Sequence, residues 1–132
     1  MSLLVDTSIL IRQQKGDRVV KKELEELSKR YSATPSITFI NVFEYLMGVK
    51  LWIKRKIEAA NFLENFSIVN TTDKTPEIMT SLRLKYDRKG LQLSLSDLII
   101  ASLAIENKMT LLTSDEDFAH IEELRLEFIN NR

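Results

Sequence analysis

Four acidic residues stand beside or within apolar segments, where an acidic side chain is unusual. Asp6 directly follows the apolar run 2–5, and Asp115 lies just past the apolar run 109–112. Glu44 stands inside an apolar segment, and Asp97 begins the most apolar stretch of the chain. An ionised carboxylate is rarely buried without a partner, because its desolvation costs several kcal/mol. The four positions therefore point to a shared site.

Each acid taken alone has a structural explanation. Asp6 and Asp97 could cap helices, Glu44 could pair with a lysine at helical spacing, and Asp115 could belong to a solvated acidic turn. Ligands of open α/β sheets, however, bind beyond the carboxyl ends of the strands, and both Asp6 and Asp115 follow predicted strands. A like-charge pair about 4 Å apart costs about 4 kcal/mol at an effective dielectric constant of about 20. Such a cluster persists when a cation neutralises it, and hard oxygen ligands select Mg²⁺ or Mn²⁺.

The composition removes several other chemistries. The chain has no cysteine, which excludes a disulfide, a zinc–thiolate site and a cysteine nucleophile. With His120 as the one histidine, a histidine-centred mechanism has no support and zinc is a poor candidate. The first residues carry no basic segment before an apolar stretch, and no apolar run approaches the ~20 residues of a membrane helix. These features predict a cytoplasmic protein that does not engage a membrane.

The charge balance gives no global case for nucleic-acid binding. Nineteen basic and nineteen acidic residues give a formal net charge of zero, so any such case rests on the local distribution of charge. Segments 50–56 and 83–89 are locally basic, although both could be solvated helix faces. The candidate contacts to an RNA backbone are Lys50, Lys54, Arg55, Lys56, Arg83 and Lys85.

Predicted strands and helices alternate along the chain. Apolar or alternating runs predict strands at 2–5, 31–33, 67–69, 109–112 and 124–128, the last at a sheet edge. Helical spacing predicts helices at 8–16, 17–27, 36–47, 49–66, 77–90 and 97–105, and a loop or short helix at 114–118. Asp17 and either Ser94 or Ser96 are candidate N-caps. The alternation favours one α/β domain over residues 1–132, with a short, mostly parallel central sheet flanked by helices.

Four motifs taken together resemble the PIN-domain ribonucleases, and most closely the VapC-type toxins of toxin–antitoxin pairs. The motifs are VDTSIL at 5–10, SIT at 36–38 with NVFEYLMG at 41–48, LSDLIIA at 95–101, and LLTSDEDF at 111–118. Any one motif is common by chance, whereas the ordered set of four is specific. The resemblance implies a PIN-like fold and an endoribonuclease that hydrolyses RNA phosphodiester bonds with Mg²⁺ or Mn²⁺. It also implies a cognate antitoxin protein as partner and a homodimer.

The resemblance also implies roles for individual residues. The implied catalytic, metal-binding residues are Asp6, Glu44, Asp97 and Asp115, with Asp117 as a further metal ligand. Thr7 or Ser8, together with Thr113, would orient carboxylates or water by hydrogen bonding. The family often has Asn where Asp115 stands, with a longer spacing to the Asp-Phe pair that Asp117 begins. The relative roles of Asp115 and Asp117 therefore stay open at this point.

Other functions would share some of these features. A solitary PIN-domain nuclease that processes RNA, or a non-catalytic PIN scaffold, would carry the same motifs, although all four acids are present here. A phosphoacceptor signalling domain also gathers acids and binds Mg²⁺, but it needs an acceptor Asp on a central strand and a late Lys, and neither is evident. A haloacid-type phosphohydrolase needs a second acid two residues after the first, where this chain has Ser8.

Overall fold

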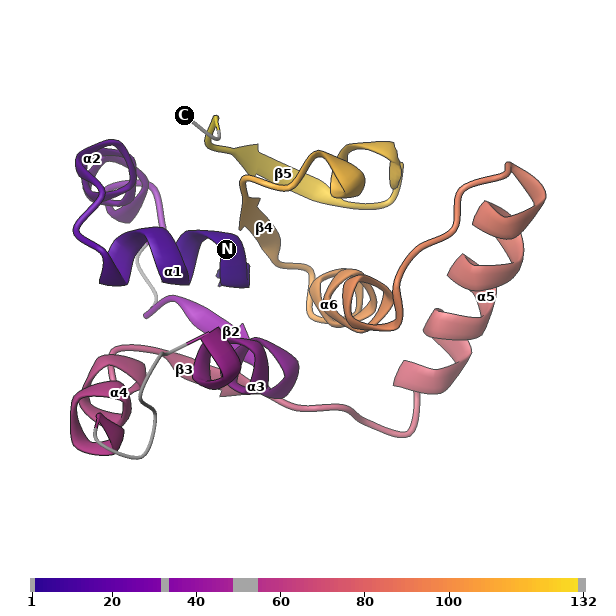
Figure 1. Cartoon of the computed structure of the whole chain (residues 1–132). Coiled ribbons are helices and arrows are strands. Elements are labelled where there is room, and N and C mark those ends of the chain that lie inside the picture. Colours follow the sequence, from indigo (N-terminus) through magenta and orange to yellow (C-terminus); the bar gives the residue numbers. More distant parts are fainter. Residues whose placement is uncertain (1, 32–33, 49–54, 131–132) are drawn as a thin grey trace.

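A parallel five-stranded sheet lies at the centre of the molecule (Figure 1). The computed structural model describes residues 2–31, 34–48 and 55–130. The strands are β1 (Leu3–Val5), β2 (Ser36–Thr38), β3 (Ser67–Val69), β4 (Thr110–Thr113) and β5 (Arg125–Phe128). Their order is β3-β2-β1-β4-β5, and every neighbouring pair is parallel. The predicted α/β class is confirmed, and so is the position of the last strand at an edge.

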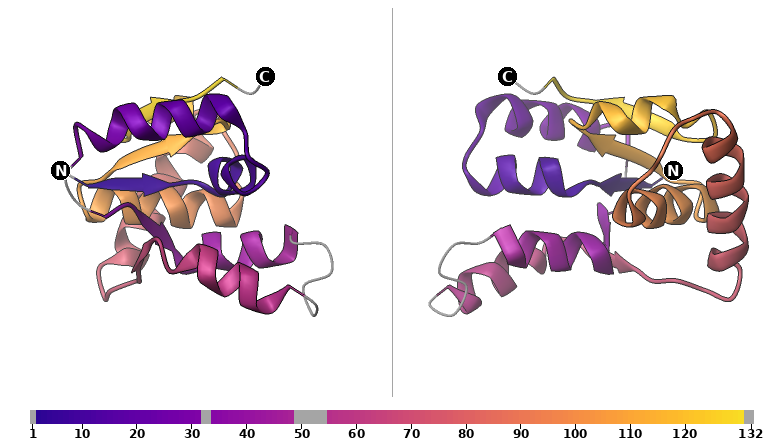
Figure 2. Two further views of the ribbon diagram at one scale, coloured as in Figure 1. Left: turned by 90° about the vertical axis from the view of Figure 1, so that its left-hand side faces the viewer. Right: turned by 45° about the vertical axis from the view of Figure 1, so that its right-hand side comes forward.

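Helices cover both faces of this sheet. Those in the described ranges are α1 (Thr7–Gln14), α2 (Arg18–Ser28), α3 (Phe39–Gly48), α4 (Lys56–Leu63), α5 (Thr75–Arg88), α6 (Leu95–Glu106) and the 3-10 helix η2 (Glu116–His120). Figure 1 shows α1 and α2 on one side of the sheet and α5 and α6 on the other, and the right-hand view of Figure 2 keeps α5 opposite α1 and α2. No helix in these ranges is long and apolar enough to cross a membrane.

The central strands divide their side chains between two apolar cores. On β1, Leu3 and Val5 belong to one core and Leu4 to the other, and on β4 Leu112 and Leu111 divide in the same way. Helices α1 to α4 contribute to the first core, and α5, α6 and η2 to the second. Strands buried on both faces read as continuous apolar runs, which is why β1 and β4 were visible in the sequence. Because apolar cores cover both faces of these strands, the polar side chains of a site lie at the strand ends.

The second strand lies elsewhere than the sequence indicated. A strand at 31–33 and a helix from Ser36 were expected, but β2 is Ser36–Thr38 and the helix begins at Phe39. Tyr31 is in no strand, and residues 32–33 lie outside the described residues. The Asn41 N–H donates to Thr38 Oγ1 at 3.1 Å, while the Thr38 N–H donates to Asn41 Oδ1 at 2.9 Å. This reciprocal cap starts the helix after Thr38 and leaves the preceding residues free to pair with β1 and β3.

The predicted helix at 49–66 is also too long at its end. The described helix α4 stops at Leu63, and residues 49–54, which include Lys50 and Lys54, lie outside the described residues. Beyond α4, the side-chain amide of Asn65 donates to the carbonyl oxygen of Phe62 at 2.9 Å. The last carbonyls are thereby capped, and the chain turns into β3.

Two predicted helix ends are confirmed by their caps. The Asp17 side chain accepts hydrogen bonds from the N–H groups of Val19 and Val20 at 2.9 and 3.2 Å and so begins α2. Of the two candidate serines, Ser94 caps α6 by accepting from the N–H of Asp97 at 3.2 Å. This cap fixes the first turn of α6, which carries Asp97.

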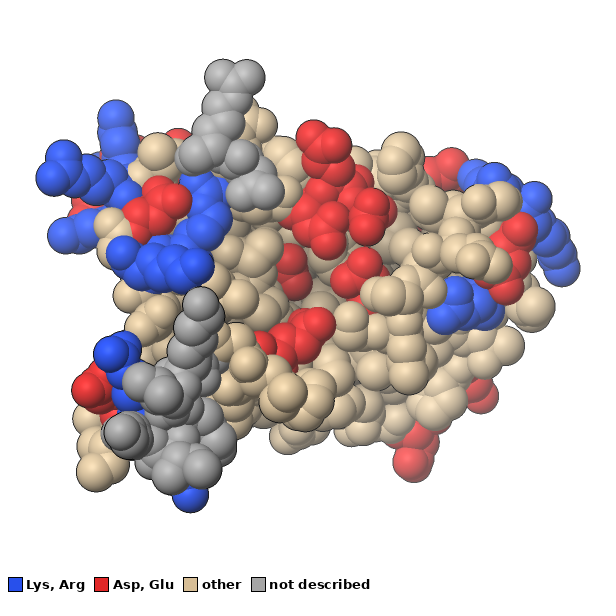
Figure 3. All heavy atoms as spheres, viewed as in Figure 1, with Lys and Arg blue, Asp and Glu red and all other residues tan. Residues whose placement is uncertain are grey.

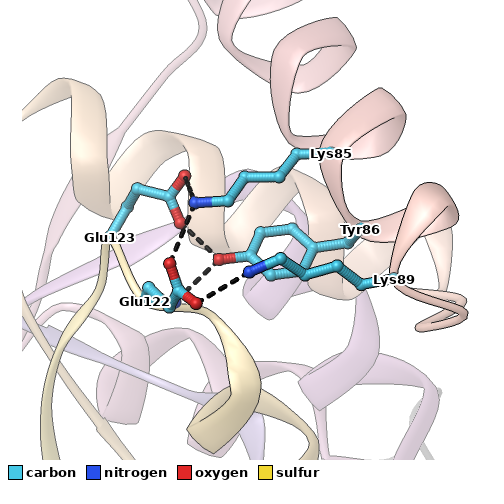
Figure 4. Close-up of polar contacts among 5 residues, drawn as sticks. All are labelled: Lys85, Tyr86, Lys89, Glu122 and Glu123. Atoms are coloured by element: carbon cyan, nitrogen blue, oxygen red, sulfur yellow. Dashed lines mark hydrogen bonds and ion pairs between the residues drawn. The ribbon is translucent and has the colours of Figure 1, made fainter.

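A polar cluster fastens α5 to the segment that precedes β5 (Figure 4). The Tyr86 hydroxyl donates to the Glu123 carboxylate and accepts from the N–H of Glu122 at 2.8 Å. Lys85 Nζ lies 3.1 Å from Oε2 of both Glu122 and Glu123, and Lys89 Nζ lies 2.8 Å from Oε1 of Glu122. Hydrogen bonds from Lys89 and Lys85 lower the pKa of Glu122. The cluster anchors the outer helix at the amino end of β5, away from the carboxyl edge.

Candidate functional site

Asp6 lies at the carboxyl end of β1 and is only 5% exposed. Its Oδ2 accepts hydrogen bonds from Ser8 Oγ at 2.9 Å and from Thr113 Oγ1 at 2.8 Å. Burial raises the pKa of Asp6; the two hydroxyls act against that rise, and the charge of Glu44 adds to it. Side chains from helix α1 and strand β4 thus hold this carboxylate in one orientation.

Thr113 also positions the acids that follow β4. Its Oγ1 accepts from the N–H of Asp115 at 3.0 Å, and Asp115 Oδ1 accepts from the N–H of Asp117 at 2.9 Å. Asp115 therefore caps η2, whose fully buried Phe118 anchors the turn in the second core. One threonine connects the orientation of Asp6 to that of the turn.

Asp97, Asp115 and Asp117 form a cluster at this edge. Each offers a carboxylate oxygen, and the three oxygens lie within 4.8 Å of one another. Burial, followed by the charges of Asp115 and Asp6, raises the pKa of Asp97 to about 6. The structure thus brings both Asp115 and Asp117 to the cluster, with Asp6 in electrostatic contact.

Glu44 reaches the same edge from α3 through a chain of hydrogen bonds. Thr7 Oγ1 donates to Glu44 Oε1 at 2.8 Å, and Asn41 Nδ2 donates to Thr7 Oγ1 at 2.9 Å. The fully buried Asn41 has its amide orientation fixed, because its Oδ1 accepts from both the N–H and the hydroxyl of Thr38. Asn41 supplies one hydrogen to the Thr7 oxygen, so the hydroxyl's own hydrogen is directed at Glu44. Glu44 is outside the three-acid cluster but acts on Asp6 by its charge.

Asn41 and Thr38 were not singled out in the sequence. The available signal was the spacing of three residues between Thr38 and Asn41, which is typical of a reciprocal helix cap. Asn41 in turn precedes the embedded acid Glu44 by three residues. Such a cap does not by itself indicate that the amide also contacts Thr7.

Arg12 is a third residue whose role the sequence did not reveal. Its Nη1 donates to Ser114 Oγ and to the carbonyl oxygen of Asn130, both at 2.7 Å, and its Nε lies 2.9 Å from Asp17 Oδ2. The N–H of Ser114 donates to Ser8 Oγ at 3.1 Å. Arg12 thereby ties α1 to the end of β4 and to the chain after β5. The sequence signal for this contact was the charged side chain of Arg12 at the end of the otherwise apolar segment 9–12.

The chemistry of these side chains suits a hard cation. The site presents carboxylate oxygens backed by hydroxyl groups, with no sulfur or imidazole ligand. Among the residues that the structure describes, no lysine or arginine forms an ion pair with any of these acids. Burial, together with the charges of neighbouring acids, raises the pKa of Asp97, as is common for groups at functional sites. Oxygen-only ligands of this kind fit Mg²⁺ or Mn²⁺.

The acids open onto a hollow of the surface. Figure 3 shows acidic side chains gathered in the middle of the face seen in Figure 1, with lysines and arginines toward its margins. A cavity of about 600 Å³ adjoins the cluster. Its lining residues are Ser8, Ser114, Asp115, Glu116, Asp117 and Phe128. The carboxylates of Asp115 and Asp117 are therefore accessible from a cavity of this size.

None of the basic candidates among the described residues lines this cavity. Arg83 donates to the carbonyl oxygen of Leu93 at 2.7 Å, and Lys85 binds Glu122 and Glu123 in the cluster of Figure 4. Both belong to α5 and are engaged within the protein. Arg55 and Lys56 are exposed at the start of α4, whereas Lys50 and Lys54 lie outside the described residues. A role in RNA binding stays a prediction for this whole set.

Comparisons with known proteins find a matching family model and similar structures. The family model described as "PIN domain" matches residues 3–124. The structure of VapBC2 from Rickettsia felis, bound to a DNA fragment from their promoter, is 29% identical with a TM-score of 0.84, over 97% of this chain and 98% of that one. A toxin–antitoxin complex from Klebsiella pneumoniae is 30% identical with a TM-score of 0.74, over 93% and 95% of the two chains.

A more distant likeness shows the fold alone. DNA-bound VapBC from Salmonella typhimurium is 17% identical with a TM-score of 0.80, over 97% of this chain and 98% of that chain. No curated protein matches the chain. The resemblance to VapC-like PIN domains, first drawn from four short motifs, is confirmed by the matched family and by these structures.

Proposed function

The chain belongs to the PIN domain family, and from that premise we propose that it is a divalent-metal-dependent endoribonuclease, the toxin of a toxin–antitoxin pair. The observation that carries the proposal is the cluster of Asp97, Asp115 and Asp117, with Asp6 held beside it by Thr113. The VapC-like fold supports a nuclease of this class. Metal dependence and RNA as the substrate are our own inferences.

Asp6, Asp97, Asp115 and Asp117 would hold the cation, with Glu44 acting from the α3 side. When bound, a divalent cation supplies Lewis-acid stabilisation of the charge that develops on a scissile phosphate. The protein's own part is orientation, since Ser8 and Thr113 hold Asp6 and Thr7 holds Glu44. A phosphodiester brings further negative charge to these acids and is repelled without compensation, so we expect cleavage to require metal.

A cognate antitoxin and a homodimer complete the proposal. The two most similar structures reported above are, by name, VapBC2 and a toxin–antitoxin complex, which supports an antitoxin partner here. An exposed apolar stripe on α3 supports self-association, because Phe39, Phe43 and Met47 recur at helical spacing and are 43%, 57% and 72% exposed. We keep a cytoplasmic location as part of this proposal.

The test is cleavage of labelled single-stranded RNA with Mg²⁺ or Mn²⁺ and with a chelator. We expect cleavage with metal only, and at least a hundredfold loss of rate in Asp6→Asn and in Asp97→Asn. Asp73→Asn, which alters an exposed acid outside the cluster, is the control and should cleave as wild type does. Unchanged cleavage in both site variants would contradict the proposal. Labelling by acetyl phosphate, with no RNA cleavage, would favour a phosphoacceptor domain instead.

A further inference from the structure

An exposed aromatic ring lies in the cavity beside the acids. Phe128 is 41% exposed and lines the cavity with Ser8, Ser114 and the acidic turn. On β5 it stands opposite Thr113, the threonine that holds both Asp6 and the N–H of Asp115. The next residue, Ile129, is 3% exposed and donates its N–H to the Thr113 carbonyl oxygen at 2.9 Å. The ring is therefore held at a defined place one strand away from the cluster.

The packing of the fold does not account for this ring. Leu126, two residues earlier on β5, packs against the second core, whereas Phe128 belongs to neither of the two described cores. The ring contacts found among the described aromatic residues join Tyr45, Phe62 and Phe66, and none involves Phe128. Two-fifths of Phe128 stays in water, and this exposed part contributes nothing to the burial of apolar surface. The exposed part of the ring faces the cavity beside the acids.

We propose that Phe128 is a stacking platform for a nucleobase of the RNA next to the scissile phosphate. This inference rests on the proposed nuclease function and adds a base-binding subsite to it. The acids on one side of the cavity would hold the cation that receives the phosphate, whereas the ring of Phe128 on the β5 side offers an uncharged apolar face, which suits the uncharged base. Proteins that bind single-stranded RNA stack unpaired bases on aromatic side chains of this kind. In this arrangement the cation would bind the scissile phosphate, and the β5 side of the cavity would bind the adjacent base.

If Phe128 stacks on a base, the effect of replacing it should depend on the RNA that is cleaved. A purely structural role of Phe128 would give no such dependence. We expect Phe128→Ala to lower kcat/KM for single-stranded RNA by about tenfold, while Phe128→Tyr and Phe128→Trp, which keep a stacking face, retain most of it. Leu84→Ala is the matched control, because Leu84 is 53% exposed on the remote helix α5. Melting curves of each variant check that the fold is kept.

The deciding experiment uses a series of RNAs that carry one abasic site at each position around the cut. If Phe128 stacks on a base, one abasic position should slow wild type by the same factor as Phe128→Ala, and the variant should lose nothing further there. Phe128→Ala that cleaves intact RNA as wild type does would overturn the inference alone. A loss of equal size on every abasic RNA would also overturn it, since that indicates a structural defect. Failure of the wild type to cleave any RNA would overturn the proposed function and this inference with it.

Discussion

The raised pKa of Asp97 means that its ionised carboxylate destabilises the folded, metal-free chain. Burial and the neighbouring acids raise this pKa to about 6, from an ordinary value of 3.8. Between these two pH values the folded chain binds more protons at this group than the unfolded chain does. The metal-free protein therefore loses stability as the pH rises through this window, and the full penalty is present above about pH 6. A site that costs stability in this way has to be maintained for its chemistry.

We expect Asp97→Asn to melt a few degrees higher than wild type at pH 7 in a chelating buffer, because the amide removes a charge from the cluster. The difference should shrink as the pH falls from about 6 and vanish well below pH 3.8, where wild-type Asp97 is protonated in both the folded and the unfolded state. Melting curves recorded from about pH 3 to pH 8 test this. A difference that is constant across this range would show that the charge of Asp97 is not the cause.

At the same scale, the sequence indicated the acids and the hydroxyl groups of Thr7, Ser8 and Thr113 that contact them, but not the roles of Arg12 and Asn41. Asp6 and Asp115 could be predicted because each comes shortly after a buried strand with an apolar run, Leu3–Val5 for Asp6 and Leu111 with Leu112 for Asp115. The Arg12 contact with Ser114 joins residues 102 positions apart, and the Asn41 contact with Thr7 joins residues 34 positions apart. Contacts of this kind depend on the strand order β2-β1-β4, which no local pattern contains.

At the scale of elements, the fold confirms the elements that were predicted from continuous apolar runs and corrects a strand that was predicted from a weaker local pattern. The apolar helix α6 and the strands β1 and β4 could be predicted because burial on all sides leaves a continuous apolar signal. The strand β2 was placed five residues too early, since segments 31–33 and 36–38 have similar local preference for a strand. Pairing with β1 and β3 decides between them, and that pairing is a tertiary property.

Helix α5 offers a test of how an element is attached without touching the site. We expect Tyr86→Phe to lower the free energy of unfolding by about 1–2 kcal/mol, because the N–H of Glu122 and the Glu123 carboxylate both lose a partner. Urea unfolding measures the loss, and the rate of RNA cleavage should stay as in wild type. An equal loss of cleavage would mean that α5 contributes to the site.

The pH dependence of this attachment follows from Glu123. Burial acts to raise its pKa, but hydrogen bonds from Tyr86 and Lys85 outweigh burial and lower it from its ordinary value of 4.5. A lowered pKa contributes stability above the unfolded value, and that stability is lost as the pH falls through the folded value. The difference between wild type and Tyr86→Phe should therefore be full at pH 7 and diminish below about pH 4.5.

At the scale of the whole molecule, a net charge of zero conceals a strong division of charge. Acids gather at the carboxyl edge of the sheet, and basic side chains lie toward the margins of the same face (Figure 3). A bulk count could not predict this division, because it arises when β1, α6 and the turn after β4 bring distant carboxylates together. The proposed function therefore depends on a cation that neutralises the acids at this edge of the sheet.

Binding of Mn²⁺, followed by the loss of its free-ion paramagnetic resonance signal, tests the central claim most directly. We predict saturable binding to wild type, at least tenfold weaker binding to Asp97→Asn, and unchanged binding to the control Asp73→Asn. No binding by wild type at millimolar Mn²⁺, or equal binding by wild type and Asp97→Asn, would contradict a cation site among these acids.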